Sequence, residues 1–218
     1  MDKLFNMDNP VMKFLTLVFD LLVLNVLWVI CSIPIFTIGA STTALYYSCF
    51  KRIREDEGYT VKNFFHSFKV NFKLATLIWL ILLLIGGLLG TDVWYTLTTD
   101  NSIMKWFLYP CIPVVVIYLM ELLFVFPTLA LFDNKLLGTI KNAFLFALLN
   151  LGECIAVIII AFLMLAGAYF IGLLSALCLI LGAATFAYLT SHLYLRAFKP
   201  YMVKKDENGN VIEDESQS

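Results

Sequence analysis

Charged side chains are scarce in this chain. Only 14% of the residues are Asp, Glu, Lys or Arg, whereas about a quarter are charged in an average soluble domain. Hydrophobic residues make up 61% and the mean hydropathy is +0.87. Such a composition excludes an ordinary soluble domain, and a net charge of -1 leaves no basic footprint for nucleic acid. The composition therefore predicts an integral membrane protein that contacts lipid and binds no nucleic acid.

The residues that carry most enzyme chemistry are also scarce. The chain has two histidines, His66 and His192, and it has no HExxH motif and no His/Cys cluster. It contains neither a Gly-x-Ser-x-Gly elbow nor a phosphate-binding loop of the Walker type. The five cysteines are scattered without a CxxC pair, which is typical of small core residues. We therefore expect no catalytic residue, no metal and no cofactor, and we expect that the protein is not an enzyme.

The chain does contain a series of long apolar segments with short polar separators. A helix needs about 20 apolar residues to cross a bilayer, so the chain has room for about five or six crossings. The apolar residues do not alternate as in a barrel, which favours an all-α transmembrane helical bundle. The first run is too long for a signal peptide and is expected to remain as an anchor. The expected helices lie at about 11–33, 38–55, 74–97, 106–132, 140–166 and 169–197 in a single transmembrane domain, 1–199, before a disordered acidic cytoplasmic tail, 200–218.

The second of these helices, at 38–55, decides the count of crossings. It follows a break predicted at about Ile33–Gly39, because Pro34 lacks an N–H and Gly39 permits a backbone conformation closed to other residues. The bundle has six crossings if this short helix spans and five if it only dips. Cations at its end, Lys51–Arg54, and others after the last helix favour six crossings with a cytoplasmic C-terminus.

A short amphipathic interfacial helix is predicted at about 60–72. Its phenylalanines fall on one face and its cations on another, which is typical of a helix lying in the cytoplasmic interface. The same pattern also fits a docking surface for a cytoplasmic partner, and the two interpretations are compatible. The expected contact residues are Phe64, Phe68, Lys69, Asn71, Phe72 and Lys73.

Four polar side chains lie within apolar segments, where they are costly unless they are paired or functional. They are Asp20, Asn25, Glu121 and Glu153. Glu121, near the middle of an apolar run, is either a contact for a substrate, ion or partner, or a structural hydrogen-bonding group with a neutral carboxyl, which we favour. The sequence indicates no ion pair for any of them. A GxxxG pattern at Gly86 and Gly90 predicts close packing within the bundle, with a homo-oligomer as the alternative.

Three stretches together resemble one known family. They are PIFTIGASTTALYY, GYTVKNFFHSFKVNFKLATLIW and FVFPTLALFDN, and over about Leu15 to Lys199 the chain is similar to the YesL family of small bacterial membrane proteins. The matching positions are Pro34, Thr37, Gly39, Thr43, Ala44 and Tyr46 in the first stretch and Phe64, Phe68, Asn71, Phe72 and Lys73 in the second.

The resemblance implies a role in sugar uptake. Members of the family occur in Firmicutes beside carbohydrate ABC permeases, so it implies an accessory subunit of such an importer in the bacterial plasma membrane, in contact with permease subunits. The first stretch, around Thr37 to Thr43, is then expected to be a hinge or partner contact, against the alternative of plain tight packing. Two other functions stay open: a self-sufficient small transporter or channel using Glu121, and a membrane sensor or scaffold.

Overall fold

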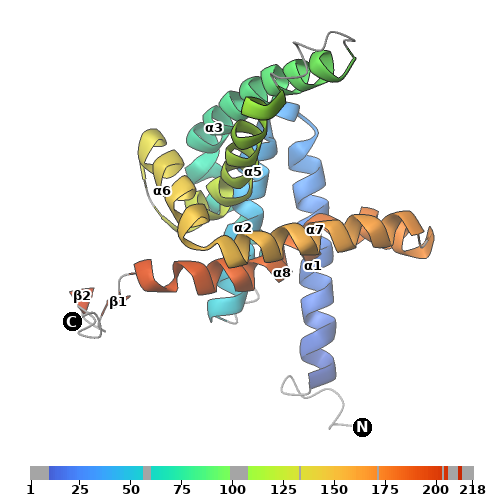
Figure 1. The fold of residues 1–218 in the computed structure, drawn as a ribbon. Helices are drawn as coiled ribbons and strands as arrows, with labels where there is room; N and C mark the ends of the chain where they lie inside the picture. The colour runs from blue at the N-terminus through green and yellow to red at the C-terminus, as the bar shows by residue number, and fades with distance from the viewer. Residues whose placement is uncertain are drawn as a thin grey trace, which may run out of the picture.

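The computed structural model describes residues 10–55, 60–98, 108–132, 134–170, 172–202, 204–205 and 211–212. Nearly all of them are helical (Figure 1). Four of the described helices, α1, α3, α5 and α7, are long and apolar enough to cross a membrane, as in a multi-pass membrane protein. The helices are α1 (Pro10–Ser32), η1 (Ile35–Thr37), α2 (Ile38–Glu55), α3 (Thr60–Thr98), α5 (Leu108–Leu131), α6 (Leu136–Leu149), α7 (Leu151–Phe170), α8 (Gly172–Phe198) and η2 (Lys199–Tyr201).

The first two helices form an antiparallel pair. Near the break between them, the Trp28 indole N–H donates to the Thr42 hydroxyl at 3.2 Å. Further along the pair, the Arg52 Nε lies 3.2 Å from an Asp20 carboxylate oxygen. The two contacts show that α1 and α2 run in opposite directions. The second half of α1 therefore lies beside nearly the whole of α2.

Helix α3 then runs antiparallel to α2. The rings of Tyr47 and His66 lie 6.2 Å apart, and Gly39 faces the carbonyl oxygen of Ala75. The first half of α3 thus lies along α2, and α1, α2 and this half of α3 make a three-helix unit. The separate interfacial helix predicted at about 60–72 is wrong, because 60–98 is one helix. Neither glycine nor proline occurs in it before Gly86, so nothing in the sequence interrupts the backbone at the expected junction.

The break before α2 is narrower than expected. It is confined to Ile33 and Pro34, after which η1 (Ile35–Thr37) leads directly into α2. The buried Thr37 hydroxyl lies 2.6 Å from the carbonyl oxygens of both Cys31 and Pro34 and donates to one of them at a time. It therefore supplies a donor where the interrupted helix has lost its own.

Gly39 has a different role from the one predicted. It lies in the first turn of α2 with helical backbone, so it is not needed for an unusual conformation. A Cβ at this position would lie 2.6 Å from the carbonyl oxygen of Ala75 and 2.7 Å from the Cβ of Trp79. The glycine therefore allows α2 and α3 to approach closely, as small residues do between membrane helices.

The single helix predicted at 140–166 is also wrong, since the chain turns at Asn150 between α6 and α7. The backbone N–H and side-chain Nδ2 of Asn150 both donate to the carbonyl of Phe146, at 3.0 and 2.9 Å. An asparagine side chain that donates to a nearby backbone carbonyl, here that of Phe146, competes with helix continuation. Figure 1 shows α7 and α8 running across the direction of α1, and the expected six crossings are not confirmed.

An aromatic cluster holds α8 against the other helices. Tyr194 is fully buried, and its hydroxyl donates to the carbonyl oxygen of Leu123 at 2.8 Å. In a regular helix that carbonyl would accept from the N–H of residue 127, which is a proline and has none. Tyr194 therefore replaces the hydrogen bond that Pro127 removes from α5. The other members of the cluster are Tyr46, Phe124, Phe132, Phe146, Phe198 and Tyr201.

Replacing Tyr194 with phenylalanine is expected to lower the free energy of unfolding by about 1 to 3 kcal/mol, because the Leu123 carbonyl is left buried without its donor. The Pro127→Ala change restores a backbone N–H, so the double variant should recover most of the loss. Thermal unfolding of the four proteins in detergent forms a double-mutant cycle. Additive losses in the double variant would contradict this role for Tyr194.

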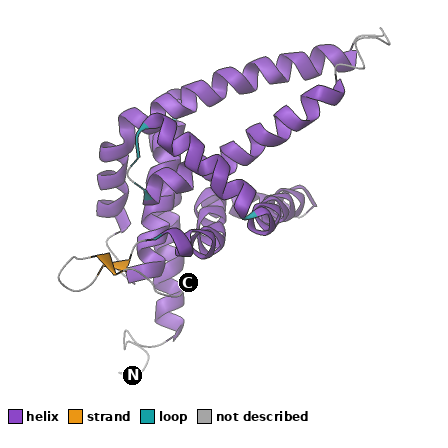
Figure 2. Ribbon diagram, turned by 60° about the vertical axis from the view of Figure 1, so that its left-hand side comes forward, coloured by secondary structure: helices purple, strands orange, loops and turns teal. Residues whose placement is uncertain are grey.

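The C-terminal segment contains a short strand pair. β1 (Lys204–Lys205) pairs antiparallel with β2 (Val211–Ile212), shown as the orange strands in Figure 2. The sequence predicted a disordered tail over 200–218, whereas the structure has a strand pair within it. The remaining residues of the tail beyond 205, like residues 106–107 of the expected fourth helix, lie outside the described residues. The division into a membrane domain and a tail stays a prediction.

Candidate functional site

The first half of α3 presents a cationic face. Four side chains at helical spacing are exposed along it: Lys62, His66, Lys69 and Lys73. Of the contact residues predicted here, only Lys69 and Lys73 are exposed. Phe64 is fully buried and the others, Phe68, Asn71 and Phe72, are half-buried. These phenylalanines are therefore packing residues, and only the cationic part of the predicted surface is available to a partner.

The cationic face of α3 lies at the same level as an apolar surface on α1. Lys69 and Lys73 fall between His66 and Ala75, the two points at which α3 meets α2. The contact from α2 to Trp28 places this part of α3 at the level of the second half of α1. At that level α1 exposes apolar side chains, namely Val26, Val29 and Ile30, which are 52%, 47% and 56% exposed. The three-helix unit therefore shows a lipid-compatible face and a cationic face at the same level.

An ion pair that the sequence did not indicate joins Asp20 of α1 to Arg52 of α2. The Asp20 and Arg52 side chains are only 11% and 14% exposed. The Arg52 Nε and an Asp20 carboxylate oxygen lie 3.2 Å apart, so the opposite charges attract in a position largely shielded from water. Sequence analysis missed the pair because it placed Arg52 at the membrane interface and Asp20 inside a crossing.

The other polar residues of the apolar segments have separate roles. Asn25 is buried, and its side-chain oxygen accepts from the backbone N–H of Ala184 at 3.2 Å, which joins α1 to α8. Glu153 is half-buried in the first turn of α7 and not deep within a crossing helix. A carboxylate at a helix N-terminus is favoured by the helix dipole. Neither Asn25 nor Glu153 lines the pocket that contains Glu121.

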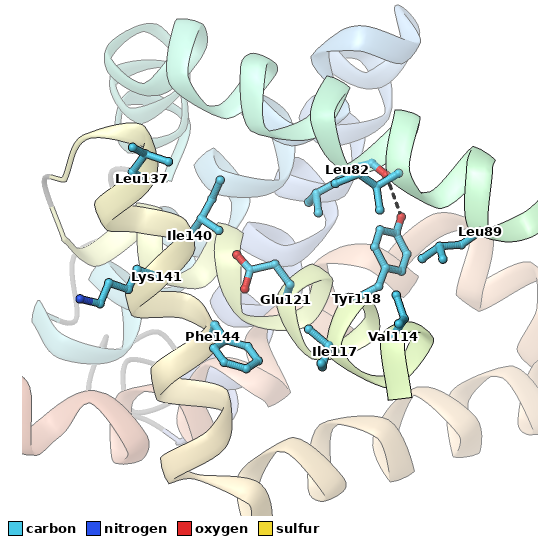
Figure 3. Close-up of a pocket in the computed structure, with 11 residues that line it drawn as sticks. Leu82, Leu89, Val114, Ile117, Tyr118, Glu121, Leu137, Ile140, Lys141 and Phe144 are labelled. Carbon is cyan, nitrogen blue, oxygen red and sulfur yellow. Dashed lines mark hydrogen bonds between the residues drawn. The ribbon is translucent and has the colours of Figure 1, made fainter. Parts of the chain in front are cut away.

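Glu121 lines a pocket of about 570 Å³ between α3, α5 and α6 (Figure 3). The residue is 8% exposed, and both its carboxyl oxygens are buried without a hydrogen-bond partner among the described residues. The structural hydrogen bond that the sequence analysis favoured for this carboxyl is therefore absent from the described part of the chain. Tyr118 and Lys141 also line the pocket, and the rest of its walls are apolar and include Leu82, Ile85, Leu89, Val114, Ile117 and Phe144.

Tyr118 fixes one wall of this pocket. Its hydroxyl donates to the carbonyl oxygen of Leu82 at 3.1 Å, drawn as the dashed line in Figure 3. Gly86 lies directly beneath the tyrosine hydroxyl, whereas Gly90 has no atom within 4 Å of the position of a Cβ. Among the described residues, Gly86 therefore packs against a neighbouring helix and Gly90 does not, and the homo-oligomer stays a prediction.

The first stretch of the family resemblance is mostly interior. Pro34 is exposed, but Thr37, Gly39, Thr43, Ala44 and Tyr46 are buried between α2 and its neighbours. The Tyr46 hydroxyl lies 3.3 Å from the Thr190 hydroxyl of α8, within hydrogen-bond distance. This arrangement is the tight packing that the sequence analysis kept as an alternative. A hinge or partner-contact role for these residues stays a prediction.

The comparisons with known proteins match a segment that overlaps most of the three-helix unit. A family described as "Protein of unknown function, DUF624" matches residues 21–93, which is 73 of the 218 residues. The match is consistent with the resemblance given above, because YesL-type proteins carry this segment. No curated protein and no solved structure matches the chain. The matched segment contains the whole cationic face but only the α3 wall of the Glu121 pocket.

Proposed function

We propose that this chain is an accessory integral-membrane subunit of a carbohydrate ABC importer in the bacterial plasma membrane. It contacts the permease subunits through the cationic face of α3. The observation that supports the contact is the exposure of Lys69 and Lys73 at the level where α1 exposes only apolar side chains. The assignment to a carbohydrate importer rests on the family resemblance.

The cost of a charge in lipid supports a protein partner. A lysine in the hydrocarbon layer is costly, by about 2.5 to 3.5 kcal/mol at the centre on the most permissive scales and by less toward the interface, where the side chain can snorkel. If α1 crosses the membrane, Lys69 and Lys73 lie at a depth where lipid would be an unfavourable neighbour. A polar or acidic surface of another membrane protein would remove this cost. The proposal places the contact inside the segment matched by the family, where a shared function is expected to lie.

The proposed topology follows from the same argument. Helices α1 and α2 cross the membrane as an antiparallel pair with the N-terminus in the cytoplasm, whereas α7 and α8, which run across α1, do not cross in the same direction. The Asp20–Arg52 pair and the cations at the end of α2 lie toward the cytoplasmic side, in keeping with the positive-inside preference. Ile33, Ile35 and Phe36, which are exposed around the break, lie at the outer interface.

Reversing the charge on this face is expected to break the contact. In the native host, the tagged Lys69→Glu/Lys73→Glu variant should recover at least about tenfold less permease than the original chain, because like charges across an interface cost several kcal/mol. Both residues are exposed, so the variant should keep its thermal stability. The matched control is Lys141→Glu, an exposed lysine on α6 outside this face.

Two results would count against the proposal. One is recovery of the tagged chain without permease subunits even after crosslinking. The other is permease recovery that is equal for the double variant and the Lys141→Glu control, which would place the contact elsewhere on the molecule.

A further inference from the structure

We infer that the Glu121 pocket binds a membrane-soluble molecule that has a long apolar body and one hydrogen-bond-donating head group. The pocket volume of about 570 Å³ lies within the range of small-molecule sites, roughly 300 to 1,000 Å³, and its composition is also typical of them. Three helices supply mostly apolar walls, the Tyr118 hydroxyl is bonded to the Leu82 carbonyl, and Glu121 supplies a carboxyl (Figure 3).

The mouth of the pocket opens on an apolar surface. Four lining residues, Ile85, Val114, Ile117 and Leu137, are 41%, 47%, 47% and 79% exposed. These side chains belong at once to the pocket and to the outer surface of helices that are apolar enough to lie in a membrane. A ligand therefore enters from the hydrocarbon layer and not from water, which selects molecules that dissolve in lipid.

The carboxyl specifies the head group. Both oxygens of Glu121 are buried and have no partner among the described residues, so the pocket offers acceptors that its own walls leave unused. Buried polar groups are normally hydrogen-bonded, and an unpaired one is costly. In Figure 3 the Lys141 ammonium points away from Glu121 and does not neutralise it. An O–H or N–H donor on the ligand would satisfy the carboxyl oxygens, whereas a purely apolar ligand would leave them unpaired.

The ligand class is therefore a long-chain alcohol or a long-chain amine. Both share the donor and the apolar body and differ only in charge. This site goes beyond the proposed function, because α5 and α6 lie outside the segment matched by the family. The permease contact and the ligand site use different parts of the molecule. An experiment can therefore contradict the proposed permease contact and still support ligand binding in the pocket, or the reverse.

Photo-crosslinking of the purified full chain tests the inference. The probes are diazirine derivatives of hexadecanol, hexadecylamine and hexadecane in phosphatidylcholine nanodiscs, and the labelled peptides are identified by mass spectrometry. The alcohol or the amine should label α3, α5 and α6 at the pocket at least about tenfold more than the alkane, the ratio expected for one hydrogen bond to a buried carboxyl. Equal labelling by all three probes would overturn the inference.

Two pairs of variants locate the binding and identify the head group. Ile117→Trp fills the pocket and should abolish the labelling, whereas Val116→Trp, on the exposed side of the same helix, should not. Glu121→Leu should reduce labelling to that of the alkane. Glu121→Gln should retain an alcohol and lose an amine. Equal labelling of Ile117→Trp and Val116→Trp would show surface lipid only, provided that both elute as the original chain does in gel filtration.

Discussion

Replacing Arg52 with alanine is expected to lower the free energy of unfolding by about 3 to 5 kcal/mol, the usual cost of removing one partner of a buried ion pair. Asp20 is 7% exposed, so its carboxylate would stay in a largely shielded position without Arg52. For a chain of this length the loss corresponds to a fall in the unfolding temperature of roughly 6 to 20 °C. Thermal unfolding of the detergent-purified chain measures it.

The matched variants separate charge from packing. Arg54 is exposed on the same helix, and Arg54→Ala should change the unfolding free energy by less than about 0.5 kcal/mol. The neutral pair Asp20→Asn/Arg52→Gln should recover most of the loss, because neither partner is then an isolated buried charge. Equal stability of Arg52→Ala and Arg54→Ala would rule out an energetic role for the pair.

The Gly39→Ala substitution is expected to destabilise the three-helix unit by about 1 to 3 kcal/mol or more, as overpacking of a close contact does. The new methyl group would meet the Ala75 carbonyl oxygen at 2.6 Å, the Trp79 Cβ at 2.7 Å and the Phe126 Cε1 at 2.9 Å. The first two atoms cannot move away by rotating a side chain, so α2 and α3 would have to separate. A fall in the unfolding temperature and in the yield of folded protein checks this.

Gly90→Ala is the control for this substitution. Its Cβ would have no neighbour within 4 Å, and alanine is the better helix former, so stability should be unchanged or slightly higher. Unchanged stability of Gly39→Ala would mean that α2 and α3 are not as close as the structure has them.

The sequence predicted the beginning of the fold better than the rest. The ends of α1 and α2 follow from Pro34 and from the apolar runs on either side of it, and both helices lie close to their predicted bounds. The amphipathic pattern at 60–72 correctly predicted a helix with an apolar face. A pattern cannot say whether lipid or a neighbouring helix covers that face, and here α2 covers it. The helix expected at 140–166 ran through Asn150, whereas the chain turns at this residue between α6 and α7.

The candidate sites were predictable to different degrees. Glu121 stands out in the sequence because it is an isolated carboxyl in a long apolar run. Its pocket does not, because α3, α5 and α6 each supply a wall and their packing is not encoded at any local spacing. The Asp20–Arg52 pair depends on how far α2 slides along α1, and no residue pattern within either helix sets that register.

The central claim is that the cationic face of α3 contacts protein while α1 at the same level contacts lipid. The most direct measurement is in-cell photo-crosslinking from benzoylphenylalanine placed at Lys69 and, in a second strain, at Val29. The account predicts a covalent adduct with a permease subunit at position 69 and no protein adduct at position 29. The absence of a protein adduct at position 69, or equal adducts at both positions, would contradict it.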